Sequence, residues 1–269
     1  MSAHDLPDLR RAREGAILLV TLDRPDARNA YSEAMVDSLV RALDEADRDD
    51  EVRCIILTGA GAAFSAGGDL KAMLAHEGMF AGGPVELRRR YIDGIQRIPR
   101  RFALAEKPVI AAINGPAIGA GLDLACMCDL RIAARGAQLG STFVKVGLVP
   151  GDGGAYFLSR TVGFSRALEL MLTARLVDTD EALRIGLVHH AVEPAELLPT
   201  ARALAEQLAA LPPLALRMTK RAAYRSFDAD LEHALELAAT YQGVVQNTAD
   251  HHEAVQSMLE RRPPKFTGA

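Results

Sequence analysis

The chain lacks a long apolar run, an excess of positive charge and an even set of cysteines. Its 269 residues carry a formal net charge of −4, so no basic face is expected to attract nucleic acid or anionic lipid. No stretch approaches the roughly 18 uninterrupted apolar residues of a membrane span, and the opening segment MSAHDLPDLRR has no apolar run after its charges. We therefore expect a cytoplasmic protein with no nucleic-acid or membrane partner.

The cysteines and histidines give no sign of a disulfide framework or a metal centre. Cys54, Cys126 and Cys128 lie in apolar segments, as is typical of small buried side chains in a reducing compartment. The histidine pairs at 189–190 and 251–252 lack an H-E-x-x-H pattern or other zinc-ligand spacing. We therefore expect no metal site.

Strand and helix patterns alternate through the first two thirds of the chain. Short apolar runs at 17–22, 54–58 and 109–113 each end in turn residues, and a helical pattern with an N-cap at Ser32 spans 32–47 between the first two. A helix-compatible segment follows at 119–127, with another extended run at 130–134. This alternation predicts an α/β fold with a mainly parallel sheet, assigned to residues 1–193.

The strand signals stop near residue 194, and the remainder has helical character. The expected helices span 194–211, 214–225, 228–245 and 250–262. Short helices bury little surface alone, so the 194–269 region must pack on the α/β body or on another subunit. We interpret it as an all-helical oligomerisation region of a homo-oligomer.

Two loops of small residues follow strand ends and could accept a negatively charged oxygen. These are FSAGGDL (64–70) and GPAIGAGLD (115–123). Small side chains allow close backbone approach, and N–H groups at a helix N-terminus favour negative charge. The two loops are therefore candidates for an oxyanion hole, although each is also compatible with a simple tight connection between strand and helix.

Several sequence blocks, taken in order, are similar to one enzyme family. They are RPDARNAYS (24–32), FSAGGDL (64–70), the segment 107–133, GLVPGDGG (147–154), EALRIGLV (181–188) and LERRPPKFTG (259–268). Their order and spacing resemble the enoyl-CoA hydratase/isomerase, or crotonase, family. The resemblance implies a spiral core of repeated β-β-α and βαβ units, a C-terminal helical region, and a homotrimer or dimer of trimers.

The resemblance also implies which backbone groups act on the substrate. Ala66 and Ala120 match the two amides that hold the thioester oxygen of an acyl-coenzyme A. The loss of one such donor typically costs about 2.7–4 kcal/mol of transition-state stabilisation. Coenzyme A is here part of the substrate, and no separate cofactor is expected.

Further positions are implied to contact the coenzyme A or the acyl group. Arg28 would lie near phosphate, although a solvated side chain is an alternative for it, and the 66–70 loop would lie near adenine. The implied substrate-binding residues are Arg28, Ala30, Ala66, Gly67, Asp69, Leu70, Gly119 and Phe143. The arginine run at 88–90 is interpreted as a solvated helix face and not as a phosphate site.

The expected acids depart from the family pattern. Asp123 matches the first of two acids that a hydratase uses, but Phe143 stands where the second is expected. Asp152 is the candidate replacement, with helix capping as its alternative role. A single base is sufficient to move a double bond, so isomerisation needs only one carboxylate. Hydration requires Asp152, or a water ordered by Ser141 or Thr142, to take the missing role.

Other functions remain as alternatives. A dinucleotide-dependent oxidoreductase would need a third glycine where Leu124 stands, and a serine hydrolase using Ser65 would need a G-x-S-x-G elbow. A non-catalytic acyl-CoA binder is compatible with Phe143. Thioester hydrolysis or decarboxylation is the remaining alternative within the family.

Overall fold

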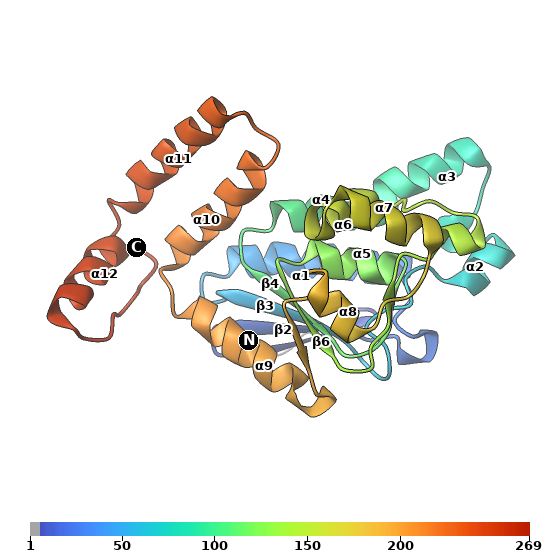
Figure 1. Ribbon diagram of the computed structural model, residues 1–269, viewed down its shortest axis with the longest axis horizontal. Helices are drawn as coiled ribbons and strands as arrows, with labels where there is room; N and C mark the ends of the chain where they lie inside the picture. The colour runs from blue at the N-terminus through green and yellow to red at the C-terminus, as the bar shows by residue number, and fades with distance from the viewer. Residues whose placement is uncertain (1–5) are drawn as a thin grey trace.

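The centre of the fold is a six-stranded sheet in the order β1-β2-β3-β4-β6-β8. A computed structural model describes residues 6–269. Strand β1 is antiparallel to β2, and the other neighbouring pairs in this sheet are parallel (Figure 1). The strands are β1 Leu9–Glu14, β2 Ile17–Leu22, β3 Cys54–Gly59, β4 Val109–Ile113, β6 Leu130–Ala134 and β8 His190–Val192. The predicted α/β class with a mainly parallel sheet is confirmed.

Helices cover both faces of this sheet. Helix α9 (Leu197–Ala209) buries Ala201 and Ala205 against one face, in a cluster that includes Ile56 of β3. On the other side lie α1 (Glu33–Arg48) and, in Figure 1, α4 and α5. The remaining helices of the body are α2 Leu70–Ala75, α3 Pro84–Arg90, α4 Arg97–Leu104, α5 Ala120–Met127, α6 Gly154–Val162, α7 Phe164–Thr173 and α8 Thr179–Arg184.

The predicted first helix forms for the expected reasons. The Ser32 hydroxyl accepts a hydrogen bond of 2.9 Å from the Met35 N–H, which satisfies one of the free donors at the start of α1. Met35 and Leu39 are fully buried four residues apart. Strand β1 has no such signal, because in LRRARE only Leu9 is buried. The charged side chains suit an edge strand and conceal it from pattern analysis.

A second, two-stranded sheet places successive turns of the spiral beside one another. Strands β5 (Ala117–Ile118) and β7 (Leu139–Gly140) pair in parallel. Single bridges extend this pairing from Ser65 to Ala117 and from Leu139 to Val177. The loop that follows β3 therefore lies directly against the loop that precedes α5.

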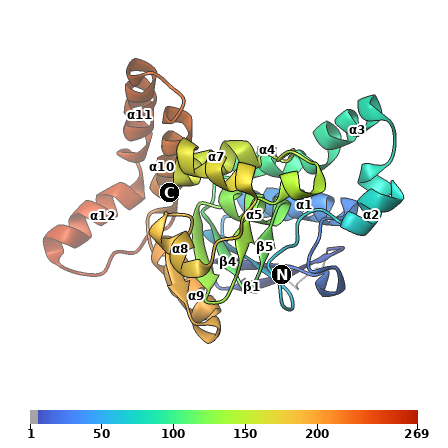
Figure 2. The same cartoon turned by 45° about the vertical axis from the view of Figure 1, so that its right-hand side comes forward.

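The last three helices extend away from the body as an arm. They are α10 Pro213–Ser226, α11 Leu231–Val245 and α12 Ala249–Glu260, and in both views α11 and α12 lie away from the layered body (Figure 1 and Figure 2). Neither α10 nor α11 contains a buried residue. The helices predicted after residue 194 are confirmed, but only α9 packs on the sheet.

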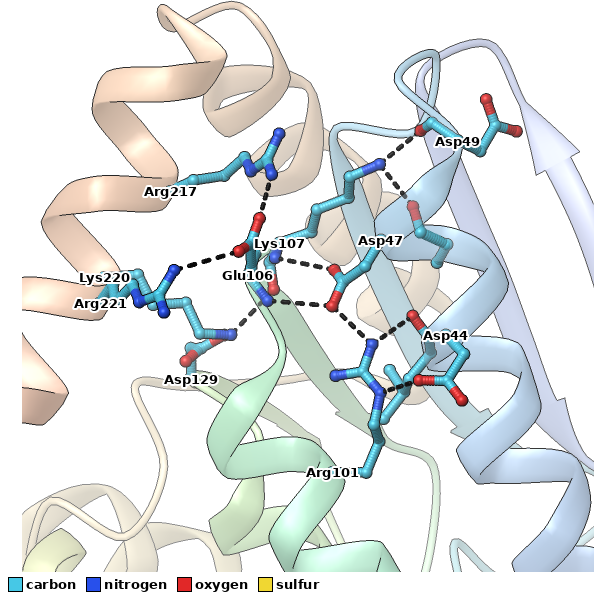
Figure 3. A network of polar contacts seen from close by, with 12 residues as sticks. Asp44, Asp47, Asp49, Arg101, Glu106, Lys107, Asp129, Arg217, Lys220 and Arg221 are labelled. Carbon is cyan, nitrogen blue, oxygen red and sulfur yellow. Dashed lines mark hydrogen bonds and ion pairs between the residues drawn. The ribbon is translucent and has the colours of Figure 1, made fainter. Parts of the chain in front are cut away.

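A network of charged groups joins α10 to the body (Figure 3). Glu106 accepts hydrogen bonds from Arg217 and from Arg221. Lys220 donates a hydrogen bond of 2.7 Å to Asp129. The arm is thus fixed at its base by ion pairs, while its apolar side chains remain exposed. Across residues 6–269, no helix is both long and apolar enough to cross a membrane.

Candidate active site

The two small-residue loops meet because glycine allows their backbones to approach closely. A Cβ at Gly67 would lie 2.5 Å from the Ile118 carbonyl oxygen and 2.8 Å from the Ala120 nitrogen. At Gly121 a Cβ would lie 2.1 Å from the Ser65 carbonyl oxygen. Any larger residue would force the loops apart, so the predicted meeting of the segments 64–70 and 115–123 depends on these glycines.

The two predicted oxyanion amides differ in their present hydrogen bonding. Ala120 is the first residue of α5, and no group within residues 6–269 accepts from its N–H. The Ala66 N–H donates to the Arg28 carbonyl at 2.9 Å. The free amide at a helix N-terminus is suited to bind an anionic oxygen, whereas Ala66 must share or release its bond to Arg28 before it can act.

A mainly apolar pocket opens beside these amides. Six of the predicted site residues line it: Ala66, Leu70, Gly119, Ala120, Phe143 and Asp152. Further lining comes from α2, from Tyr91 and Ile95, and from the loop 142–148. Phe143 approaches Gly119, where a Cβ would lie 3.8 Å from the ring. Phe143 thus contributes a hydrophobic surface where a second acid was expected.

Asp123 and Asp152 form a buried pair of carboxyl groups. The side chain of Asp123 comes from α5 and is 0% exposed, and that of Asp152 precedes α6 and is 2% exposed. The two carboxyl groups lie close enough for each to affect the pKa of the other, and within residues 6–269 none of their oxygens has a hydrogen-bond partner. Buried polar groups without a partner are costly, so a proton shared by the two groups would lower the cost of burying them.

Burial raises the pKa of both carboxyl groups in this pair. The pKa of Asp123 is raised well above its ordinary value, first by burial and then by the charge of Asp152. Burial also raises the pKa of Asp152, but a hydrogen bond from Asp123 opposes that rise. Both carboxyl groups are therefore easier to protonate than an exposed aspartate, and Asp152 is the member of the pair that lines the pocket.

The helix-capping alternative for Asp152 is wrong. The N-cap of α6 is Gly153, and no side chain accepts a capping hydrogen bond there. Instead, Gly154 leaves room for the acid pair, because a Cβ at that position would lie 2.1 Å from the Asp123 Oδ2 atom. The sequence GDGG is explained by the space that two carboxyl groups need.

The remaining predicted contacts lie around the pocket and not in its lining. Arg28 is exposed in a left-handed conformation with φ 50°, and its guanidinium has no ion-pair partner within residues 6–269. Ala30 and Gly67 are buried in the loop beneath the site. Asp69 caps α2, where it accepts from the N–H groups of residues 71 and 72. Only Arg28 among these side chains is free to contact a phosphate.

Ser65 is held in a structural role. It is completely buried, donates a hydrogen bond of 2.8 Å to the Asn29 carbonyl and accepts one from the Gly67 N–H. A hydroxyl with both roles filled cannot act as a nucleophile in this arrangement. The serine-hydrolase alternative is therefore not supported.

Two further residues were missed by sequence analysis. Asn29 is fully buried with φ 55°, and its amide donates to the carbonyls of Ala60 and Ala63. Tyr31 donates from its buried hydroxyl to the Ala120 carbonyl at 3.1 Å. Both join the 24–32 block to the oxyanion loops. The only sequence signal for these two residues was that both lie in RPDARNAYS (24–32), one of the blocks that resemble the family.

Comparison with known proteins identifies this architecture. The model of the enoyl-CoA hydratase/isomerase family matches residues 12–269. The chain belongs to the enoyl-CoA hydratase/isomerase family. The resemblance seen in the sequence is confirmed, and this membership favours acyl-CoA chemistry over the dinucleotide alternative.

Relatives in this family include both hydratases and isomerases. The short-chain-enoyl-CoA hydratase of Clostridium acetobutylicum is 39% identical over 251 residues, covering 93% of this chain and 94% of the relative. The 1,2-epoxyphenylacetyl-CoA isomerase of Escherichia coli is 36% identical over 256 residues, covering 95% and 96%. The crystal structure of an enoyl-CoA hydratase from Bacillus anthracis has a TM-score of 0.91 at 32% identity, covering 97% of this chain and 100% of that one. The crotonase-type fold is confirmed.

Proposed function

We propose that the protein binds an acyl-CoA thioester at the Ala120 amide and uses the Asp123–Asp152 pair to move protons on its acyl group. The observation that carries this proposal is the buried acid pair, one member of which lines the same pocket as a free helix N-terminal amide. Hydrogen bonding to the thioester oxygen stabilises an enolate. A carboxylate beside it then removes or returns the proton.

The acid pair supports hydration as well as isomerisation. In hydration, the Asp152 carboxylate takes a proton from water as the water oxygen bonds to the β-carbon, and Asp152 then gives one proton to the α-carbon. Asp123 does not line the pocket, so it acts by exchanging the proton of the pair with Asp152, and the pair ends the reaction with one proton, as it began. In isomerisation, Asp152 alone removes a proton from one carbon and returns it to another. The relocated second acid thus compensates for Phe143.

The oxyanion hole is completed only if Ala66 is released from the Arg28 carbonyl. Arg28 and Asn29 both have positive φ, at 50° and 55°, and such conformations are uncommon for residues other than glycine. A local change in this loop would free the Ala66 N–H for the thioester oxygen. The Arg28 side chain would then hold a phosphate of the coenzyme A.

Matched isosteric substitutions test the proposed chemistry. Asp123→Asn and Asp152→Asn keep side-chain size, and each variant should be assayed for water addition to 2-enoyl-CoA and for conversion of 3-enoyl-CoA to 2-enoyl-CoA. We expect Asp152→Asn to lower both rates by at least 100-fold with acyl-CoA binding retained. Asp123→Asn should lower hydration more than isomerisation. Asp93→Asn is the control, because Asp93 is exposed and lies outside the pocket.

The outcomes separate this function from its alternatives. Retained binding with wild-type rates in both aspartate variants contradicts the proposal and favours a non-catalytic binder. Release of free coenzyme A or of carbon dioxide by the wild-type protein, without either double-bond reaction, favours thioester hydrolysis or decarboxylation. No binding of any acyl-CoA overturns the whole assignment.

We also propose a homotrimer or a dimer of trimers built through the arm. The large apolar side chains exposed on the arm include Phe227, Leu231, Leu235, Met258 and Leu259, of which Met258 and Leu259 are about 80% exposed. Contiguous exposed apolar surface is typical of an interface. Light scattering should show an oligomer, and loss of residues 210–269 should reduce it. A stable monomer at micromolar concentration would contradict this assembly.

The remaining expectations concern cofactor and location. We propose that the reaction uses no cofactor besides the coenzyme A of its substrate, because carboxyl groups and backbone amides provide the acid, the base and the oxyanion donor. We propose a cytoplasmic location, which the three free, buried cysteines favour. Activity of extensively dialysed enzyme and cell fractionation test these two points.

A further inference from the structure

Tyr91 is a polar residue of the pocket that the proposed mechanism leaves without a role. It begins a π-helical turn, Tyr91–Ile95, in which Gly94 departs from helical geometry with φ −108° and ψ −105°. Such turns occur frequently at functional sites. Tyr91 lines the same pocket as Ala120 and Asp152. The backbone irregularity therefore lies directly at the acyl site.

Two contacts fix this turn against the residue that precedes Asp152. A Cβ on Gly151 would lie 2.9 Å from Cε1 and 3.7 Å from Cζ of the Tyr91 ring, so the ring edge that leads to the hydroxyl rests on this glycine. The Gln96 side-chain amide donates a hydrogen bond of 2.8 Å to the Gly151 carbonyl. The Tyr91 hydroxyl is close enough to Asp152 for that carboxylate to raise its pKa, second to the effect of burial.

The hydroxyl has no hydrogen-bond partner within residues 6–269. The pocket around it is formed largely by apolar side chains, including Phe80, Ile95 and Phe143. A tyrosine hydroxyl that leaves bulk water usually finds a partner, and an unmade hydrogen bond in such surroundings is costly. When an acyl group fills the pocket and displaces water, an oxygen of the substrate can take the place of that water as the partner.

We propose that Tyr91 is a specificity-determining residue whose hydroxyl donates a hydrogen bond to an oxygen carried by the acyl chain beyond the thioester carbonyl. The favoured ligands are acyl-CoA thioesters with a hydroxyl or ether oxygen near the β-carbon. This inference rests on the proposed acyl-CoA function. It adds a contact that distinguishes oxygenated acyl chains from saturated or unsaturated chains of the same length.

Calorimetry with a matched pair of ligands tests the contact. The Kd values of 3-hydroxybutyryl-CoA and butyryl-CoA are measured with Asp123→Asn as the parent, because that variant limits turnover and Asp123 does not line the pocket. Adding Tyr91→Phe should raise the Kd of 3-hydroxybutyryl-CoA by about three- to tenfold, as expected for the loss of one neutral hydrogen bond. The Kd of butyryl-CoA should change less than twofold.

Two further variants make the result decisive. Tyr156→Phe removes a hydroxyl from an exposed tyrosine whose partner is Asp228, and it should leave the ratio of the two Kd values unchanged. Gly151→Ala should reduce the ratio, because its Cβ displaces the Tyr91 ring. This variant decides the question if circular dichroism shows that Tyr91→Phe is unfolded.

The outcomes distinguish failure of this inference from failure of the proposed function. Suppose that both ligands bind and that Tyr91→Phe leaves the ratio of the two Kd values as in the parent, or weakens the binding of both ligands equally. The proposed role of Tyr91 is then wrong, and the acyl-CoA function stands. If neither ligand binds to the wild-type protein or the parent, both proposals are overturned.

Discussion

At the scale of single residues, the buried acid pair lowers the free energy of unfolding by an amount that depends on pH. The raised pKa of Asp123 means that the folded protein holds a proton that the unfolded chain releases. Stability therefore falls as pH rises above the unfolded-state value of about 3.9 and continues to fall until the folded-state pKa is passed. This destabilisation is compatible with an active site, where such groups are retained for chemistry.

Asp123→Asn should accordingly stabilise the protein at neutral pH. The substitution supplies a neutral amide that donates to the Asp152 carboxylate without a titrating proton at position 123. We expect a higher free energy of unfolding than wild type at pH 7 and a difference that shrinks toward pH 4. Urea denaturation across this pH range measures it. Equal differences at pH 4 and pH 7 would show that the pKa of Asp123 is not raised.

The sequence allowed the members of the acid pair to be named, but not their contact. Asp123 and Asp152 were both candidates, and Phe143 at the expected acid position pointed to a replacement. Their close approach depends on the space at Gly154, where a Cβ would meet Asp123, and on burial, which no local pattern reveals. Tyr91 could not be predicted because the π-helical turn that places it has no clear sequence signature.

At the scale of elements, the N-terminus of α5 is the part of the site most directly tied to secondary structure. Ala120 is its first residue, and its N–H is free because the helix cannot use it. Proline is well tolerated at the first position of a helix but has no N–H. A single substitution can therefore remove the proposed oxyanion donor and keep the helix.

Ala120→Pro should lower the catalytic rate by about 100- to 1000-fold, which is the typical effect of losing one oxyanion donor. Circular dichroism should show an unchanged helix content. Ala155→Pro is the matched control, because Ala155 is an exposed residue in the first turn of α6. Wild-type rates in a folded Ala120→Pro protein would remove this amide from the mechanism.

The elements themselves were predictable to different degrees. The central strands β3 and β4 are continuous apolar runs with complete burial of β4, and these gave clear signals. The two-residue strands β5 and β7 are too short for any periodicity. They pair because the spiral returns to the same place, which is a property of the whole chain.

At the scale of the whole molecule, the charged network at residue 106 sets the position of the arm. Glu106 pairs with two arginines of α10 at partly exposed positions, so each pair contributes about 1 kcal/mol or less. The position of the arm relative to the body was beyond sequence analysis, because helix periodicity says nothing about which face meets another subunit.

Glu106→Gln should weaken assembly more than it weakens the fold. The expected result is a lower oligomer fraction at low micromolar concentration, with a small fall in Tm. The oligomer fraction of the variant should also depend less on salt concentration than that of the wild type, because the ion pairs that salt screens are gone. Analytical ultracentrifugation measures the fraction. Glu51→Gln is the control, because Glu51 forms an exposed pair with Arg13 outside the arm. If both variants lower the oligomer fraction equally, the charged network has no special role in assembly.

The central claim is that this pocket enolises an acyl-CoA thioester, and α-proton exchange tests it most directly. Butyryl-CoA has no double bond to hydrate or move, so its incubation with the protein in deuterated water reports proton removal alone. The account predicts deuterium at the α-carbon, detected by mass spectrometry, with exchange lowered at least 100-fold in Asp152→Asn and unchanged in Asp93→Asn. Bound butyryl-CoA without exchange in the wild-type protein, or equal exchange in Asp152→Asn, would contradict it.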